Sequence, residues 1–369
     1  MEGLVGAFGG IFKGRRVLVS GNLGFKGAWL SLWLKLLGAK VYGYSLKPDT
    51  EPRLSDVLGV ENFVEAQEVG DICDSEKLSK FFSLAKPEVV IHMAAQPLVR
   101  LSYREPVETY RTNVMGSLNM LEAARAEKSV RAFVNVTTDK CYQNREVSYA
   151  YKESDPFGGY DMYSSSKACS EILTASYRAS FLGGEGSFAL ASARAGNVIG
   201  GGDWALDRIV PDCIRALSKG EAIIVRSPDA VRPWEHVLEP LAGYLRLAQL
   251  LLENPQKYSE GFNFGPEETS ILRVAELVDL IIKSWGSGEM KVLKSDNLHE
   301  AKLLMLDISK SKSQLGFKPV CDAAEAVAMT VDWYRNFYSK SGIDAFEFTK
   351  AQIADFTAKA RNKNIVWAV

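Results

Sequence analysis

Apolar residues follow two different rhythms in the first half of the chain. Apolar runs, which are typical of strands buried on both faces, occur at 15–20, 40–45, 88–93, 131–136 and 188–193, and a further strand is expected near 63–69. Between them, apolar residues recur every three or four positions at 25–37, 75–86, 105–127 and 163–181, which predicts helices over these ranges. Strands that alternate with helices in this way predict an α/β fold with a doubly wound parallel sheet.

This alternation ends after Arg194. Glycines cluster at Gly196 and at 200–202, and shorter strands and helices follow without a regular order. We therefore expect two regions. The first spans residues 1–193 and is joined by a returning segment near 232–263, within which a helix is expected over 236–254. The second, smaller region is formed by residues 194–231 and 264–369.

The composition is that of an ordinary globular protein. Of 369 residues, 47% are hydrophobic and 24% charged, and 44 Lys and Arg stand against 45 Asp and Glu, for a formal net charge of −1. This balance argues against a broad nucleic-acid or anionic-membrane surface. The five cysteines form no CxxC pair and only three histidines are present, so we expect neither a metal site nor a disulfide framework.

The amino terminus and the hydropathy pattern indicate the cellular compartment in which we expect the protein. Residues 1–11 are rich in glycine and apolar side chains but lack the basic start of a signal peptide, and we expect a flexible lead-in there. No apolar run approaches the ~18 residues that a membrane span needs. We therefore expect a cytoplasmic protein that binds neither membrane nor nucleic acid.

The first predicted strand leads into a glycine-rich turn. Gly21, Gly24 and Gly27 recur at intervals of three at the start of the following helix. This spacing lets the backbone turn tightly and lets a pyrophosphate approach the helix N-terminus, where N–H groups and the helix dipole stabilise an anion. At the first strand of a βα series we favour this interpretation over a plain strand–turn–helix corner. The same turn adds the candidate cofactor-binding residues Asn22, Phe25 and Lys26.

The second predicted strand ends without the acidic residue that usually binds the adenine ribose. It ends in Ser45-Leu46-Lys47, so this position does not decide between NAD and NADP. Asp71 and Ile72, which follow the third predicted strand, are candidates for the adenine side of the cofactor. The alternative for Asp71 is an acidic loop residue without such a role.

Tyr163 and Lys167 lie four residues apart, on one face at the start of a predicted helix. An ammonium beside a phenol favours the phenolate and lowers a pKa that starts near ~10. A phenolate can remove the proton from an alcohol while a hydride leaves the same carbon. This spacing also arises by chance, but residues 137–140 follow the preceding strand at the sheet edge where such folds place their ligands.

Together these residues resemble the extended short-chain dehydrogenase/reductase family of nucleotide-sugar enzymes, the NAD-dependent epimerase/dehydratases, and within it the branch that acts on CDP-glucose. The similarity covers most of the chain and is carried by the segments 24–27, 92–100, 138–142, 194–204 and 232–240 and by Asn113. The sequence departs from this branch at Asn22-Leu23, where His-Thr is usual. That departure concerns cofactor affinity more than reaction type.

The resemblance implies a Rossmann domain in the first region, with NAD held by the glycine turn and by Ala94, Ala95, Gln96 and Asn113. It implies a lyase that dehydrates CDP-glucose to CDP-4-keto-6-deoxyglucose, as a step in deoxysugar biosynthesis. In this reaction a hydride moves from C4 to C6 through the bound NAD.

The same resemblance implies roles for five catalytic residues. Tyr163 would take the proton of the 4-hydroxyl, Lys167 would lower the Tyr163 pKa and hold the cofactor ribose, and Thr138 would bind near the 4-oxygen. Asp139 would protonate the departing 6-hydroxyl, and Lys140 would remove the C5 proton. Thr-Asp-Lys at this strand end is typical of the CDP-glucose branch, whereas the dTDP-glucose dehydratases have Thr-Asp-Glu. For Lys140 the alternative is a salt bridge to Asp139.

Substrate binding would fall to the second region. Guanidinium groups match phosphate oxygens, so arginines there are candidates for the sugar-nucleotide diphosphate, and residues beside the glycine cluster could contact phosphate and pyrimidine. The alternative for the arginines is a surface ion pair. The candidates are Asn197, Trp204, Arg208, Arg215 and Arg232.

Other functions remain open on sequence grounds. A nucleotide-sugar 4-epimerase or 4-reductase would share the glycine turn, Tyr163 and Lys167 but needs no acid at Asp139. A decarboxylase that acts on a sugar acid is more distant. A non-catalytic dinucleotide sensor would tend to lose the tyrosine or the lysine, and this chain has both. We further expect a homo-oligomer, a dimer or a tetramer.

Overall fold

A seven-stranded sheet forms the centre of the computed structural model, which describes residues 2–184, 186–293 and 303–369. Its strand order is β11-β7-β5-β4-β1-β2-β3, and every pair of neighbours is parallel. This confirms the predicted α/β class and the doubly wound parallel sheet. The strands are β1 (Arg16–Ser20), β2 (Lys40–Ser45), β3 (Ala66–Val69), β4 (Val89–His92), β5 (Ala132–Val136), β7 (Ala189–Ala195) and β11 (Gly261–Phe264).

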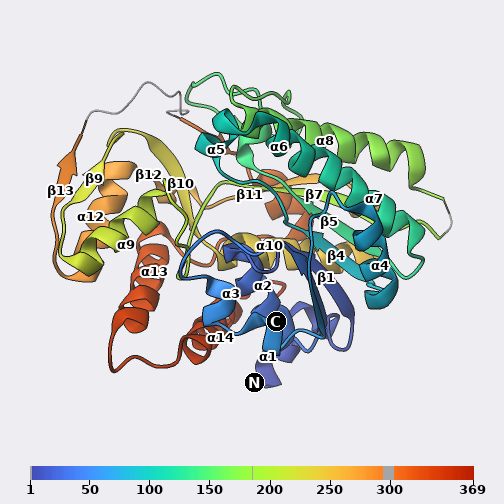
Figure 1. Cartoon of the computed structure of the whole chain (residues 1–369), viewed down its shortest axis with the longest axis horizontal. Coiled ribbons are helices and arrows are strands. Elements are labelled where there is room, and N and C mark those ends of the chain that lie inside the picture. Colours follow the sequence, from blue (N-terminus) through green and yellow to red (C-terminus); the bar gives the residue numbers. More distant parts are fainter. Residues whose placement is uncertain (1, 185, 294–302) are drawn as a thin grey trace.

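Helices cover both faces of this sheet (Figure 1). Successive residues of a buried strand point to opposite faces, and Val17 and Val19 of β1 accordingly belong to one hydrophobic cluster while Leu18 belongs to another. The helices on one face are α4 (Ser75–Ala85), α5 (Val99–Arg104), α6 (Pro106–Tyr110), α7 (Ser117–Ala126) and α8 (Met162–Phe181). On the other face lie α2 (Phe25–Leu36) and α10 (Leu238–Glu253).

The sheet reverses its strand order at β1. Ser20 at the end of β1 is paired with Tyr44 of β2 on one side and with His92 of β4 on the other. In open α/β sheets the crevice beyond the carboxyl ends of the strands at such a switch point is where ligands bind. The loops after β1, β3, β4, β5 and β7 all leave the sheet at this edge.

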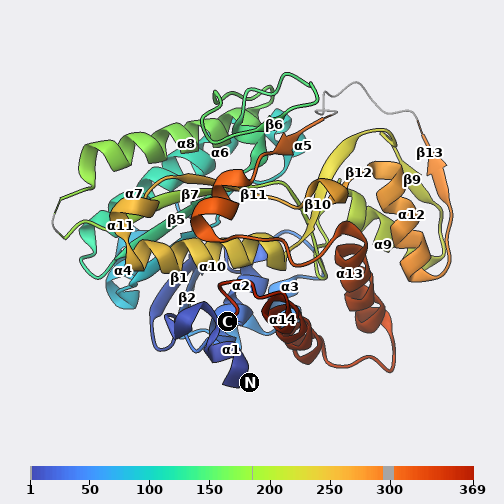
Figure 2. The same ribbon diagram turned by 180° about the vertical axis from the view of Figure 1, so that it is seen from behind.

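A second group of elements lies beside this edge, at the right of Figure 2. A three-stranded sheet has the order β12-β10-β8, and β13 pairs with β9. The strands are β8 (Asn197–Ile199), β9 (Ile223–Val225), β10 (Val231–His236), β12 (Ile271–Arg273) and β13 (Met290–Val292), and the helices are α9 (Ile209–Lys219), α12 (Val274–Trp285) and α13 (Ala323–Tyr338). Short elements complete the chain: α1 (Glu2–Val5), α3 (Leu54–Val57), β6 (Ala150–Tyr151), α11 (Pro255–Tyr258) and β14 (Met305–Leu306).

The chain returns to the first region through α10 and β11. Helix α10 contributes to the same hydrophobic cluster as β1, and β11 extends the main sheet beside β7. The carboxy-terminal helix α14 (Ala345–Asn362) also contacts the first region, since Phe356 lies 5.9 Å from Trp33 of α2 between ring centres. Residues 294–302, which fall in the expected second region, lie outside the described residues. The bounds of the two regions stay a prediction.

The amino-terminal segment is ordered against the core, so the expected flexible lead-in is wrong. Phe8 and Phe12 are buried, and the Phe8 ring stacks on Trp367 at 5.0 Å between centres. The Phe8 N–H also donates to the Trp367 carbonyl at 2.6 Å. The two ends of the chain therefore lie together over α2 (Figure 1). The reason is the indole of Trp33, whose buried surface both ends cover.

The helix expected over 105–127 is interrupted. A π-helical turn at Arg111–Gly116 separates α6 from α7. Such turns are frequent at functional sites because they re-aim one side chain. Here the turn contains Asn113, one of the predicted cofactor residues. Among the described residues, no helix is both long and apolar enough to cross a membrane.

Candidate active site

The turn after β1 is as tight as its glycines predict. Gly21 has a φ of 73°, and a Cβ on it would lie 2.8 Å from the Ala94 nitrogen. A Cβ on Gly27 would overlap the Gly21 carbonyl, so the helix can approach the turn only with glycine there. Within the described chain, the first turn of α2 has neither a side-chain cap nor an acidic residue. Its N–H groups and dipole therefore suit an anion such as a pyrophosphate.

Asn22 turns its side chain into the sheet. Its Nδ2 donates to Gln67 Oε1 at 2.6 Å, and the amide lies against Gly43 of β2, where a Cβ would overlap it. The next residue, Leu23, is buried. Asn22 and Leu23, the two residues at which the sequence departs from the CDP-glucose branch, therefore both have side-chain contacts within the protein. The backbone of the turn faces the sheet edge.

Asp71 and Ile72 follow β3 at the same edge of the sheet. The Asp71 carboxylate accepts hydrogen bonds from the Cys73 N–H at 2.8 Å and from Arg111 Nη2 at 3.0 Å. The Ile72 side chain packs on Gly116 at the end of the π-helical turn. Their cofactor role stays a prediction.

Asn113 ties the loop after β4 to the helix that carries Tyr163 and Lys167. Its Oδ1 accepts from the Gln96 N–H at 2.8 Å, and its Nδ2 donates to the Gln96 carbonyl at 3.1 Å and to Ser166 Oγ at 2.9 Å. The predicted segment Ala94–Gln96 is anchored at its other end, where the Ala94 N–H donates to Ser20 Oγ at 3.2 Å. These bonds hold the loop after β4 between the glycine turn and α8.

Tyr163 and Lys167 lie in the first two turns of α8, as predicted, and both are buried. The helix begins after Asp161, whose carboxylate accepts from the Ser164 N–H at 2.8 Å. The Lys167 ammonium donates to the Val136 carbonyl of β5 at 3.4 Å. Burial, with the nearby Lys26 charge, lowers the pKa of Lys167 to about 8.

The expected lowering of the Tyr163 pKa is wrong for this structure. Burial and the Asp139 carboxylate raise that pKa to about 12, although a hydrogen bond with Thr138 and the Arg208 charge act in the opposite direction. Lys167 does not appear among the main causes. The physical reason is that its ammonium is bound to a strand carbonyl, while the phenol is held in a desolvated position beside a carboxylate.

Thr138, Asp139 and Lys140 follow β5 at the sheet edge. Thr138 Oγ1 donates to Asp139 Oδ1 at 2.8 Å, and Lys140 Nζ lies 3.5 Å from the same oxygen. Asp139 is fully buried, and its Oδ2 has no hydrogen-bond partner among the described residues. The side chain of Lys140 is 27% exposed. The salt bridge weighed as the alternative for Lys140 is therefore present, and Thr138 connects Asp139 to Tyr163.

Lys26 faces these groups. Its side chain is half-buried, and its ammonium lies 3.5 Å from the Tyr244 hydroxyl. Burial lowers its pKa to about 8, while Glu235 and Asp139 raise that pKa and Arg208 and Lys140 lower it further. Because these charges act on Lys26 together, the lysine lies among the candidate catalytic residues.

The fold brings to this site two further ionisable residues that are not among the sequence-predicted candidates. Glu235 is buried in β10, and Glu171 is buried one helical turn after Lys167. Glu171 pairs with Arg194 at 2.8 Å. The sequence offered one signal for them, a charged residue within a predicted buried strand or on a predicted buried helix face. Such residues are rarely buried without a partner.

The predicted substrate residues divide into two groups. Arg208 pairs with Asp203 at 2.8 Å and lies close enough to Tyr163 for its charge to act on the phenol. Arg232 is buried in β10, and Asn197 begins β8 opposite Trp234. Of these three, Arg208 is the residue whose charge acts on a candidate catalytic group, and the substrate role of all three stays a prediction.

Trp204 and Arg215 have contacts within the second region, and their substrate role also stays a prediction. The Trp204 indole is buried against α13, 5.7 Å from the Trp333 ring, and its N–H donates to the Tyr338 hydroxyl at 3.2 Å. Arg215 pairs with Asp212 and donates to the Trp204 carbonyl at 3.1 Å. The aromatic face of α13, which the sequence pattern alone did not reveal, takes the indole into the core.

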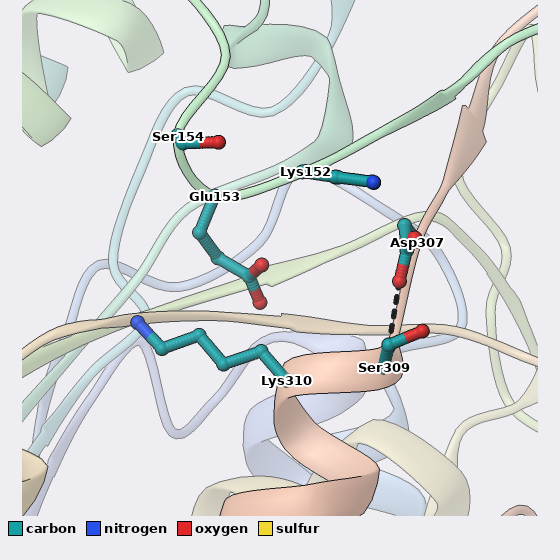
Figure 3. Close-up of a pocket in the computed structure, with 6 residues that line it drawn as sticks. All are labelled: Lys152, Glu153, Ser154, Asp307, Ser309 and Lys310. Carbon is teal, nitrogen blue, oxygen red and sulfur yellow. Dashed lines mark hydrogen bonds between the residues drawn. The ribbon is translucent and has the colours of Figure 1, made fainter.

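A hollow of about 460 Å³ opens elsewhere, between β6 and β14 (Figure 3). It contains none of the predicted site residues. Its Asp307 accepts from the Ser309 N–H at 2.7 Å, and Lys310 pairs with Glu260. The Glu153 carboxylate accepts from the Asn263 N–H at 2.8 Å. Most of its charged groups are thus engaged with neighbours, and we assign it no function. Lining residues are Lys152, Glu153, Ser154, Asp307, Ser309 and Lys310.

Comparison with known proteins places this arrangement in a family. Residues 18–330 match the profile of the family described as GDP-mannose 4,6 dehydratase. The chain belongs to this family. A relative from Salmonella typhimurium, named CDP-glucose 4,6-dehydratase, is 45% identical over 350 residues, which cover 94% of this chain and 97% of that protein.

Solved structures in the same fold include other nucleotide-sugar enzymes. A UDP-glucose 4-epimerase from Thermotoga maritima, solved with UDP-glucose, matches with a TM-score of 0.73 and 23% identity over 88% of this chain and 99% of its own. A dTDP-glucose 4,6-dehydratase from Bacillus anthracis, in complex with NAD, matches with a TM-score of 0.72 and 20% identity over 87% and 96%. At these identities the two structures support the fold of this family member alone.

Proposed function

We propose that the chain is a lyase that dehydrates CDP-glucose to CDP-4-keto-6-deoxyglucose with a bound NAD. The similarity to the Salmonella typhimurium protein named CDP-glucose 4,6-dehydratase supports the substrate and the reaction. The structural observation that carries the proposal is the grouping of Thr138, Asp139 and Lys140 with Tyr163 at one edge of the sheet. A 4-epimerase or 4-reductase has no need of the buried acid in this group.

The residues present fit NAD. The glycine turn and the uncapped start of α2 suit the pyrophosphate, and the loop held by Asn113 lies between that turn and α8. Lys167 would hold the ribose next to the nicotinamide. Bound NAD would supply the acceptor for the hydride that leaves C4 of the sugar and the source of the hydride that returns to C6. The dTDP-glucose 4,6-dehydratase from Bacillus anthracis with this fold was solved with NAD, which agrees with the choice.

Oxidation at C4 requires a base for the hydroxyl proton, and Tyr163 takes that role. A pKa of about 12 keeps the phenol protonated at neutral pH in this structure, so a positive charge must act on it before it can accept a proton. Arg208, whose charge lowers this pKa, supplies part of that charge, and Lys167 lies one turn further along α8. Thr138 binds between the phenol and Asp139 and fixes the approach of the 4-oxygen.

Elimination of water then needs a base and an acid. The amine of Lys140 takes the C5 proton, and the carboxylic acid of Asp139 gives its proton to the C6 hydroxyl, which leaves as water. The step converts neutral Lys140 and neutral Asp139 into ammonium and carboxylate. Lys140 Nζ and Asp139 Oδ1 lie 3.5 Å apart, so the base and the acid are adjacent. Lys140 later returns its proton to C5 when the hydride arrives at C6.

One proton transfer, between Tyr163 and Asp139, remains at the end of the cycle. Tyr163 has gained the proton of the 4-hydroxyl, and Asp139 has lost the proton that left in water. The Thr138 hydroxyl, which donates to Asp139 Oδ1 at 2.8 Å and hydrogen-bonds Tyr163, connects the two residues. A proton that moves along this connection restores the starting state without exchange with solvent.

The experiment that tests the function is direct. The purified protein is incubated with NAD or NADP and with CDP-, dTDP-, UDP- or GDP-hexose. We expect CDP-glucose with NAD to give a 4-keto-6-deoxy product, which develops an absorbing chromophore in alkali. Deuterium placed at C4 should appear in the C6 methyl group of the product. An epimerised sugar without the chromophore, or no turnover of any nucleotide sugar, would contradict the proposal.

A further inference from the structure

The side chain of Asn22, in the glycine turn, forms a reciprocal pair of hydrogen bonds with a side chain two strands away. Its Nδ2 donates to Gln67 Oε1 of β3 at 2.6 Å, and Gln67 Nε2 donates back to Asn22 Oδ1 at 3.3 Å. Asn22 is fully buried. Each amide both donates to and accepts from the other, which fixes the orientation of the two side chains. We call Asn22 and Gln67 the amide pair.

The amide pair crosses β2 at Gly43, where the absence of a side chain leaves room for it. In the parallel sheet Val19 is paired with Gly43, and Gly43 with Gln67, so these three residues share one face. A Cβ on Gly43 would lie 2.2 Å from Asn22 Nδ2 and 2.3 Å from Gln67 Oε1. Glycine at this position therefore lets the turn after β1 reach β3.

Tyr44 makes a second connection, on the opposite face of β2. Its carbonyl accepts from the Gly21 N–H of the glycine turn at 2.9 Å, and its hydroxyl donates to the Asp71 carbonyl at 3.0 Å. The Tyr44 side chain belongs to the hydrophobic cluster of that face, whereas Val19 belongs to the cluster of the other face. The glycine turn and the segment after β3 are thus joined on both faces of β2.

These connections set the spacing between two parts of the proposed cofactor site. The glycine turn is the candidate for the pyrophosphate, and Asp71 and Ile72, which follow β3, are the candidates for the adenine side. Strand β3 lies at the edge of the sheet, so its position depends on its contacts with a single neighbouring strand and on side-chain pairs such as this one. A ligand that bridges the turn and the end of β3 binds most tightly when their spacing is set in advance, because binding then loses no free energy in ordering the site.

We propose that Asn22 and Gln67 are positioning residues for the cofactor: the amide pair holds the glycine turn and the end of β3 at the spacing that the adenosine diphosphate half of NAD requires. The inference rests on the proposed function in taking NAD as the cofactor, and it is independent of the reaction. Neither side chain contacts NAD in this scheme, because the two amides are bound to each other. Asn22 thus acts on the cofactor through the position of the turn.

Calorimetry of NAD binding to the protein without sugar substrate tests the inference. In Asn22→Ala and in Gln67→Ala we expect the Kd for NAD to rise by about five-fold to ten-fold, the effect of losing a hydrogen bond of ordinary strength. The double variant should bind no more weakly than either single variant, since both remove the same interaction. ADP-ribose, which lacks the nicotinamide, should lose the same factor. A loss seen with NAD but absent with ADP-ribose would contradict the inference.

Two further variants separate positioning from damage to the fold. Gly43→Ala alters neither partner, but its methyl group occupies the place where the amides meet, so it should raise the Kd for NAD in the same direction. The reciprocal exchange, Asn22→Gln together with Gln67→Asn, keeps the combined length of the two side chains. It should restore the Kd for NAD to within about two-fold of the wild type, although each exchange alone weakens binding. If Asn22→Ala fails to fold, Gln67→Ala tests the same pair at the half-buried edge strand.

The matched control is Gln352→Ala, which removes another buried amide, on α14, that donates to the Met329 carbonyl at 2.7 Å. It should leave the Kd for NAD unchanged. In turnover assays of Gln67→Ala, the KM for NAD should rise with the Kd, while the KM for CDP-glucose should change less than about two-fold, because the pair acts on cofactor binding.

An unchanged Kd for NAD in both alanine variants, or an equal rise in Gln352→Ala, would overturn the inference and leave the proposed function standing. If the wild type binds NAD but turns over no nucleotide sugar, the proposed function fails, and the calorimetry still decides on the amide pair. A wild type that binds no NAD would overturn both.

Discussion

Burial sets the proton affinity of single residues at this site more strongly than their charged neighbours do. It raises the pKa of Tyr163 to about 12 and lowers the pKa of Lys26 and Lys167 to about 8. A base and two lysines that lie close together and whose pKa values each differ from the ordinary range are typical of a catalytic centre. Two residue-scale predictions follow from this arrangement.

Replacing Tyr163 by Phe should remove the base and keep the shape of the binding site. We expect turnover of CDP-glucose to fall by about 10²–10⁴-fold, because general base catalysis contributes that much. Binding of the nucleotide sugar and of NAD, followed by calorimetry, should persist, since the phenol packs by its ring. Retained turnover would exclude Tyr163 as the base, and loss of binding would assign it a role in holding the ligands.

Lys140→Met should stop the exchange of the C5 proton with solvent deuterium in a supplied 4-keto intermediate. Methionine keeps the length of the side chain but has no basic nitrogen. The matched variant Lys140→Arg keeps the cation beside Asp139 and cannot deprotonate. If Lys140 is the base, both variants lose exchange. If exchange continues in either variant, the base is another residue, and the ion pair with Asp139 is the whole function of Lys140.

At the scale of elements, helix α8 is held to the sheet directly behind Lys167. Glu171 lies one turn later, where its carboxylate pairs with Arg194 of β7 and accepts from Ser192 Oγ at 2.7 Å. Arg194 in turn donates to the Tyr142 hydroxyl at 2.6 Å. Although burial alone would raise the pKa of Glu171, Arg194 and these hydrogen bonds keep it below its usual range. This network fixes where α8 presents its two candidate catalytic residues.

Glu171→Gln should destabilise the protein strongly. The change leaves the buried Arg194 guanidinium without its counter-charge, which costs about 3–5 kcal/mol in comparable sites. Urea unfolding measures the loss. The matched control is Glu122→Gln, which removes an exposed pair with Arg125 at 2.6 Å on α7 and should cost no more than about 1 kcal/mol. Equal effects of the two changes would contradict the role of the buried network.

At the scale of the whole molecule, the start of α10 joins the two regions. Glu239 is buried there and accepts from the N–H groups of Val320, at 3.0 Å, and Cys321, at 2.7 Å, just before α13. Burial raises the pKa of Glu239 to about 7, although these hydrogen bonds and two lysines lower it. The carboxyl therefore changes charge in the physiological range at a contact between distant parts of the chain.

This contact predicts a pH dependence of stability. Folding raises the pKa of Glu239 from about 4.5, so the folded state holds the proton more tightly. Its stabilising contribution is complete below pH ~4.5 and is lost as the pH rises through about 7; the difference is on the order of 3 kcal/mol. Urea unfolding at several pH values should show this slope in the wild type and a flatter one in Glu239→Gln. Parallel slopes would refute the assignment.

The sequence by itself determined the alternation of strands and helices, six of the seven strands of the sheet and its parallel class. Because parallel strands end at one edge, Gly21 and Thr138 could be assigned to that edge from chain position, whereas Gln96 was assigned to the cofactor by the family resemblance. The helical spacing of Tyr163 and Lys167 likewise sufficed to place both on one buried face.

Only the tertiary structure decided what depends on contacts between distant segments. The amino-terminal segment, expected to be flexible, is part of the hydrophobic core because Phe8 packs on the Trp33 ring. The Trp204 ring packs on the aromatic side chains of α13. The fold reversed the expected direction of the Tyr163 pKa, and it buried Glu235 of β10 where the charge of Lys26 acts on it. The spacing of residues along the chain does not reveal how strongly a side chain is desolvated or which distant residue lies beside it. Desolvation and such distant neighbours together determine the charge of the groups at this site.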